Sequence, residues 1–164
     1  MEITGEYRIP APRQTVWEAL NDPEVLKECI PGCETLEKVS DTEFTARVST
    51  KVGPVKARFS GKVTLMDIDP PNGYRIAGEG QGGVAGFAKG SAVVKLTDDG
   101  EDTLLNYDAD AQVGGKLAQL GSRLIAGTAR KTADDFFRNF AEKVGGAEAE
   151  GGTSVDTGGG SAAG

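Results

Sequence analysis

Residues 55–65 read VKARFSGKVTL, and apolar or small residues alternate with charged or hydroxyl residues along the whole stretch. Successive side chains of a β-strand point to opposite faces of its sheet, so this period of two predicts a strand with one face in the core and one face in water. The inward set is Val55, Ala57, Phe59, Gly61, Val63 and Leu65. The chain is therefore expected to fold around a sheet with one wet face.

The same period extends on both sides of this strand. Turn residues such as Gly53-Pro54 and Asp98-Asp99-Gly100 separate the strands and keep the connections short, which favours antiparallel neighbours. Strands are predicted near residues 2–9, 34–40, 43–51, 55–67, 73–80, 84–97 and 102–112.

Three helices are predicted around these strands. Residues 13–20 carry apolar residues at helical spacing, and Asp22-Pro23 supply an N-cap and a first-turn proline for a second helix over 24–29. A long amphipathic helix is predicted over 116–144, and its apolar stripe must pack against the sheet. The fold class is α+β: a seven-stranded curved antiparallel sheet wrapped on a long C-terminal helix, with two short helices after the first strand.

The composition excludes several classes of function. The 164 residues include no histidine, which removes histidine general bases, serine–histidine nucleophiles and most zinc or iron sites, so no catalytic residue and no metal site are predicted. A net charge of -7 argues against nucleic-acid binding. The spacing of Cys29 and Cys33 fits neither a redox pair nor a metal site, and both are expected to be inert thiols in a cytoplasmic protein.

The end of the chain differs in composition from the rest. Residues 146–164 consist mainly of Gly, Ala, Ser, Thr and acids, and this composition is typical of flexible segments that bury little surface. The prediction is a domain over residues 1–145, followed by a flexible tail over 146–164 that buries nothing.

A glycine-rich run at residues 78–90, GEGQGGVAGFAKG, lies between two predicted strands. Several inward positions of the neighbouring strands are also Ala or Gly, and small residues in the middle of a sheet leave either empty space or close backbone contact. We expect a pocket for an apolar ligand; the alternative is a helix that packs unusually close. The expected lining is Ala57, Phe59, Gly61, Tyr74, Phe87, Tyr107, Gln112, Leu117, Leu120 and Leu124, and the expected hinge and mouth are Gly82, Gly83, Gly86, Gly114 and Gly115.

A basic stripe without acids is expected on the wet face of the sheet. Such a stripe suits an anionic membrane surface or an acidic partner. The alternative is ion pairing with Glu79, Asp108 or Asp110, or simple solvation. The stripe consists of Arg47, Lys51, Lys56, Arg58 and Lys62.

The spacing Gly78-x-Gly80-x-x-Gly83 matches a dinucleotide-binding fingerprint in form alone. That fingerprint requires a helix to open directly after the glycines, and here strands are predicted on both sides. No nucleotide site is expected.

The order of elements resembles the helix-grip fold of the START and birch-pollen-allergen (SRPBCC) superfamily. Five sequence blocks resemble, more specifically, the CoxG family, the small accessory proteins of aerobic carbon monoxide dehydrogenase. These blocks are DPEVL at 22–26, CIPGCE at 29–34, KVGPVKA at 51–57, GEGQGGVAGFAKG at 78–90 and QVGGKLAQLG at 112–121.

The resemblance implies a non-catalytic protein that brings a molybdenum hydroxylase, such as aerobic carbon monoxide dehydrogenase, to the cytoplasmic membrane and handles a quinone or other isoprenoid lipid. The expected location is the cytoplasm or the inner face of that membrane, with no permanent cofactor. One alternative is a recruitment or maturation factor that uses the basic stripe and binds no ligand. The other alternative is a START-like enzyme, in which Tyr74, Tyr107, Glu79 or Asp110 would supply acid–base chemistry.

Overall fold

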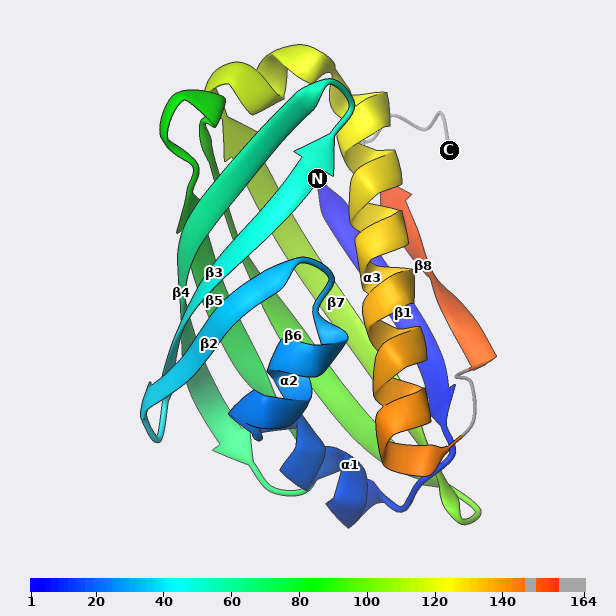
Figure 1. Ribbon diagram of the computed structural model, residues 1–164. Helices are drawn as coiled ribbons and strands as arrows, with labels where there is room; N and C mark the ends of the chain where they lie inside the picture. The colour runs from blue at the N-terminus through cyan, green and yellow to red at the C-terminus, as the bar shows by residue number, and fades with distance from the viewer. Residues whose placement is uncertain (147–149, 157–164) are drawn as a thin grey trace.

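The computed structural model describes residues 1–146 and 150–156 and contains one eight-stranded antiparallel sheet that curves around helix α3 (Figure 1). The strands lie in the order β2 (Cys33–Ser40), β3 (Glu43–Val52), β4 (Val55–Asp69), β5 (Gly73–Gln81), β6 (Phe87–Asp99), β7 (Asp102–Gly114), β1 (Glu2–Ile9) and β8 (Glu150–Asp156). The helices are α1 (Arg13–Leu20), α2 (Pro23–Cys29), α3 (Ser122–Gly145) and the short 3-10 helices η1 (Gly83–Ala85) and η2 (Gly115–Leu120).

The predicted fold class is confirmed. Helices α1 and α2 lie at one end of the sheet, whereas η1, η2 and the β3–β4 turn lie at the other end (Figure 1). The side chain of Asp22 accepts a hydrogen bond from the Glu24 amide, so it caps α2 as its position before Pro23 predicts.

The strand predicted over 84–97 begins later than expected. Residues 83–85 form η1. The φ angle is +60° at Gly83, its first residue, and +110° at Gly86, the residue that follows it. These left-handed values cannot belong to a β-strand, and glycine adopts them without steric cost. Strand β6 therefore starts at Phe87.

The helix predicted over 116–144 is interrupted. Gly121 has a φ of +91°, which no α-helix accepts, and it separates η2 from α3. The chain therefore turns between Leu120 and Ser122, and the two segments point in different directions (Figure 1).

An eighth strand lies in the segment that composition assigned to a flexible tail. Strand β8 pairs antiparallel with β1, and Thr153 lies opposite Gly5. Thr153 is only 8% exposed, and its hydroxyl contacts those of Tyr7 and Tyr107. The predicted tail was wrong for residues 150–156, because β1 offers a free edge that composition does not reveal. Residues 147–149 and 157–164 of the predicted tail lie outside the described residues.

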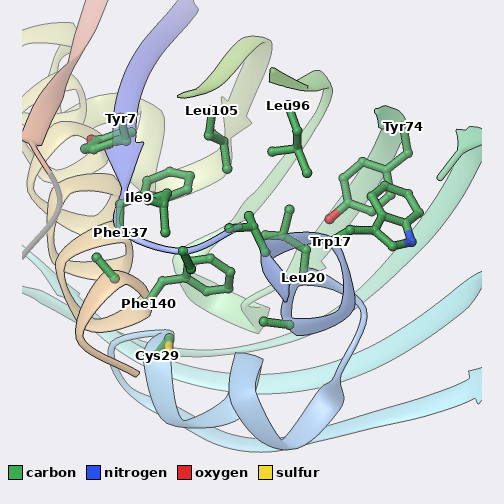
Figure 2. Close-up of a cluster of buried hydrophobic side chains, with 14 of the residues drawn as sticks. Tyr7, Ile9, Trp17, Leu20, Cys29, Tyr74, Leu96, Leu105, Phe137 and Phe140 are labelled. Carbon is green, nitrogen blue, oxygen red and sulfur yellow. The ribbon is translucent and has the colours of Figure 1, made fainter. Parts of the chain in front are cut away.

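The large buried side chains gather in the half of the interior next to α1 and α2 (Figure 2). Phe137 of α3 stacks on Tyr7 of β1 with ring centroids 4.2 Å apart, and Trp17 of α1 packs against Tyr74 of β5 at 5.3 Å. The most deeply buried large side chains include Phe140, Ile9, Leu96 and Leu105. This half of the interior is filled in the manner of an ordinary core.

The contact between β8 and the core predicts a measurable effect of Thr153→Val. The substitution keeps the shape of the side chain but removes the oxygen that both tyrosine hydroxyls contact. Buried groups that lose a partner destabilise a fold, so the free energy of unfolding should fall by about 1–3 kcal/mol in chemical denaturation. The control is Ser154→Ala on the exposed face of the same strand, which should change little. Equal stability of both variants would contradict the packing of β8.

Candidate ligand-binding site

The second half of the interior, away from α1 and α2, carries a floor of glycine and alanine on strands β4 to β7. Strand register places Gly61 opposite Gly80, Gly78 opposite Gly90, and Gly90 opposite Ala111. All of these residues are half-buried, unlike the fully buried leucines of the core. We call this set the small-residue floor: Gly61, Gly78, Gly80, Ala88, Gly90, Ala92, Ala109 and Ala111.

The space above the floor decides between a pocket and close helix packing. A Cβ atom added to Gly61 would lie 3.2 Å from the Glu79 carbonyl oxygen, and one added to Gly78 would lie 3.4 Å from Cγ2 of Val63. Within 4 Å of either added atom, all described atoms outside the adjoining residues belong to the sheet. Helix α3 therefore does not rest on these two glycines, which argues against close packing at the centre of the floor.

The backbone of α3 approaches other parts of the molecule instead. Its contacts are mostly with α2, β8 and η2, and among the strands they are mainly with β8, β1 and β3, which lie outside β4 to β7 in the sheet order. Figure 1 shows α3 in front of β1 and beside β8, whereas β4 and β5 lie at the opposite side of the view.

The loops at this end of the site touch one another through their glycines. A Cβ atom added to Gly115 would lie 2.7 Å from Cα of Gly86, and Gly115 has a φ of +72°. The backbones of η1 and η2 thus meet at a distance that only glycine allows. Leu124 lies over Gly53 of the β3–β4 turn, where an added Cβ would be 2.6 Å from its Cδ2 atom. We call this end of the molecule, formed by η1, η2, the β3–β4 turn and the first turn of α3, the mouth end.

Of the residues expected to line a pocket, six lie on the inner face of the sheet or in η2. Phe59 points along the inner face, and its ring lies over Gly82, since an added Cβ there would be 2.5 Å from the ring. Leu117 and Leu120 belong to η2, where Leu117 is buried and Leu120 is half-buried. The residues on the inner face of the sheet are Ala57, Phe59, Gly61 and Tyr107.

Four expected lining residues lie elsewhere. Gln112 pairs with Lys89 on the outer face, because it alternates with the inward Ala111, and both line a polar hollow of about 520 Å³ there. Tyr74 has the expected inward direction, but its place along β5 puts it in the core beside Trp17. Phe87 and Leu124 are 37% and 38% exposed and lie at the mouth end, not inside.

A cluster of hydroxyl groups that sequence analysis missed borders the site near β8. Tyr7 donates a hydrogen bond to Asp134 of α3, and the hydroxyl of Tyr107 lies 2.7 Å from Oγ1 of Thr153. The ring of Phe137 stacks on both tyrosines. The inward alternation of residues 2–9 could have revealed Tyr7. Local patterns could not reveal Asp134 or Thr153, because each contacts Tyr7 from more than 100 residues further along the chain.

Burial keeps the tyrosine and cysteine side chains protonated. It raises the pKa of Tyr7, Tyr74 and Tyr107, and the hydrogen bond to Asp134 raises the pKa of Tyr7 further. The hydroxyls of Tyr7 and Tyr107 therefore remain hydrogen-bond donors at neutral pH. Burial also raises the pKa of the free thiols Cys29 and Cys33, which disfavours the reactive thiolate.

The basic stripe is paired in part, with partners other than the expected acids. Arg58 lies 2.9 Å from Glu34, and Lys62 lies 3.1 Å from Glu43. Arg47, Lys51 and Lys56 have no ion-pair partner within the described part of the chain. Lys51 and Lys56 lie directly opposite each other in the β3–β4 hairpin.

The sequence matches the family model of CoxG, a subunit of carbon monoxide dehydrogenase, over residues 5–145. A conserved protein from Geobacillus kaustophilus is similar in structure, with 29% identity, a TM-score of 0.86, and coverage of 94% of this chain and 100% of that chain. No match is found among curated proteins.

More distant structures share the fold. The Zhui aromatase/cyclase from Streptomyces sp. R1128 has 13% identity and a TM-score of 0.61, with 88% of this chain and 93% of that chain covered. The protein Ara h 8.0201 has 16% identity and the same TM-score, with 88% and 97% covered. Among the described residues, no helix has the length and hydropathy needed to cross a bilayer.

The raised pKa values predict an unusual tyrosine titration. In the folded protein, absorbance near 295 nm should show tyrosinate forming at a higher pH than for a free phenol, whose pKa is about 10. The folded pKa exceeds the unfolded one, so the stability that these groups contribute is complete below about pH 10 and decreases as pH rises further. Titration of all three tyrosines near pH 10 without unfolding would contradict their burial.

Proposed function

The chain belongs to the CoxG family of carbon monoxide dehydrogenase subunits, and from this membership we propose that it is a non-catalytic accessory protein that binds an isoprenoid quinone or related lipid. In this role it links a molybdenum hydroxylase, such as an aerobic carbon monoxide dehydrogenase, to the quinone pool of the cytoplasmic membrane. The ligand occupies the space between α3 and the small-residue floor. The observation that supports this proposal is that no described atom of α3 lies within 4 Å of a Cβ added to Gly61 or Gly78.

The chemistry of the site suits a ligand with an apolar body and a few polar atoms. Half-buried Gly and Ala form the floor, and Phe59, Leu117 and Leu120 supply apolar surface around it. A site that is mostly apolar with a few polar groups is typical of small-molecule binding sites. The protonated hydroxyl of Tyr107 is a donor at the edge of the site, and quinone carbonyl oxygens are acceptors.

The residues considered for acid–base chemistry do not converge on the site. Tyr74 is in the core, and Glu79 and Asp110 are exposed residues of the outer face. Tyr107 is the one candidate at the edge of the site, and burial raises its pKa, which disfavours the tyrosinate that a general base requires. A general acid or base must lie within hydrogen-bonding reach of the reacting atom, so this arrangement favours binding over catalysis. The aromatase/cyclase neighbour shares the fold at 13% identity, which supports no common reaction.

Filling the floor should abolish ligand uptake. In Gly78→Leu the new Cβ makes ordinary contacts with the sheet, and the rest of the side chain enters the space beneath α3. We expect uptake of an isoprenoid naphthoquinone, delivered in cyclodextrin and measured by extraction after gel filtration, to fall at least tenfold. The melting temperature should stay within a few degrees, because a leucine in this strand gains buried surface and loses the flexibility of glycine.

Ala77→Leu is the matched control, because Ala77 precedes Gly78 and points to the outer face. This variant should take up the quinone as the unaltered protein does. Equal uptake by both variants would place the ligand elsewhere. An unaltered protein that takes up no quinone would contradict the binding function and favour a recruitment module without a ligand.

A further inference from the structure

Positive charge is concentrated in three segments of this acidic protein. Residues 44–66, 80–97 and 111–133 contain eleven lysines and arginines and no aspartate or glutamate, although the whole chain has a net charge of -7. These segments supply the β3–β4 turn, η1, η2 and the first half of α3. The elements of the mouth end therefore come from the parts of the chain that lack acidic residues.

Four cations of this end are exposed and free of ion pairs in the described part of the chain: Lys51, Lys56, Lys116 and Arg123. Lys51 and Lys56 are cross-strand neighbours in one hairpin. Like charges placed directly opposite each other repel, and an anion bound between them would remove that cost. The contact of Leu124 with Gly53 holds this hairpin beside the first turn of α3, which carries Arg123.

Exposed apolar side chains lie at the same end. Val84 in η1 is 93% exposed, and Phe87 and Leu124 are 37% and 38% exposed. The loops that carry them meet, since Gly86 beside η1 touches Gly115 of η2. Apolar side chains among lysines and arginines are typical of surfaces that lie in the interface of a bilayer, where the cations meet lipid phosphates and the apolar groups enter the acyl boundary.

We infer that the mouth end docks on an anionic lipid bilayer, with Lys51, Lys56, Lys116 and Arg123 against the headgroups and Val84 inserted. Docking in this orientation turns the loops of the mouth end toward the lipid, so that in the proposed function an isoprenoid tail passes between bilayer and site without crossing water. The role of the opening rests on the proposed function, whereas the docking itself does not. An acidic protein surface would match the cations but would leave Val84 without an apolar partner.

Sedimentation with vesicles tests the docking surface. The full chain should bind vesicles of phosphatidylcholine with 30% phosphatidylglycerol in low salt, and binding should decrease as salt rises or the anionic lipid is omitted. Each basic residue near such a surface strengthens binding about fivefold. The triple variant Lys51→Glu, Lys56→Glu and Arg123→Glu should therefore bind at least about 100-fold more weakly, and Val84→Asp should also weaken binding.

A second triple variant with the same change in net charge is the control: Lys27→Glu, Lys95→Glu and Arg130→Glu, three exposed cations without ion pairs in the described part of the chain. This control should keep most of the binding. Equal losses in both triple variants, or no binding of the unaltered chain to anionic vesicles, would overturn the inference. Quinone uptake from cyclodextrin involves no vesicle. If the unaltered chain takes up no quinone in that assay, the ligand site is refuted and the docking result still stands.

Discussion

The lack of side chains at the centre of strands β4 to β7 is the constraint on which the other features depend. Where Gly61 meets Gly80 and Gly78 meets Gly90, the sheet presents backbone to the interior, and α3 stays clear of it. An inner face of glycine and alanine offers few dispersion contacts to the helix that packs on the same side of the sheet. In the proposed function a ligand supplies these contacts, so the proposal depends on the floor and not on a set of catalytic groups.

The large buried side chains lie in the other half of the interior. Aromatic and aliphatic side chains pack densely beside α1 and α2, and Phe137 of α3 stacks on Tyr7 there. The C-terminal end of α3 is thus fixed in the core, while its N-terminal end lies at the mouth, where Gly121 separates it from η2. Strand β8 strengthens the fixed side, because Thr153 contacts the hydroxyls of two core tyrosines. In the proposed function, stability and ligand access therefore belong to opposite ends of one helix.

Local patterns predicted much of this fold because its strands alternate cleanly and its turns carry strong signals. Alternation placed Gly61 on the inner face, and Asp22-Pro23 predicted the cap of α2. The errors arose where the outcome depends on distant contacts or on backbone angles. Strand β8 forms because β1 has a free edge, and α3 starts late because Gly121 has a positive φ. Alternation shows which face of the sheet a side chain occupies but not whether its position along the strand lies in the core or in the site. For this reason the lining predicted for Tyr74 was not found, and Tyr74 lies in the core.

Native mass spectrometry of the protein purified from a bacterial host, with organic extraction of anything bound, tests the presence of an apolar site most directly. The open floor predicts a fraction of molecules with one added mass that extraction identifies as an isoprenoid quinone or another isoprenoid lipid. A protein that is empty on purification, and that stays empty after incubation with quinone-loaded vesicles and with quinone in cyclodextrin, would contradict the existence of the site.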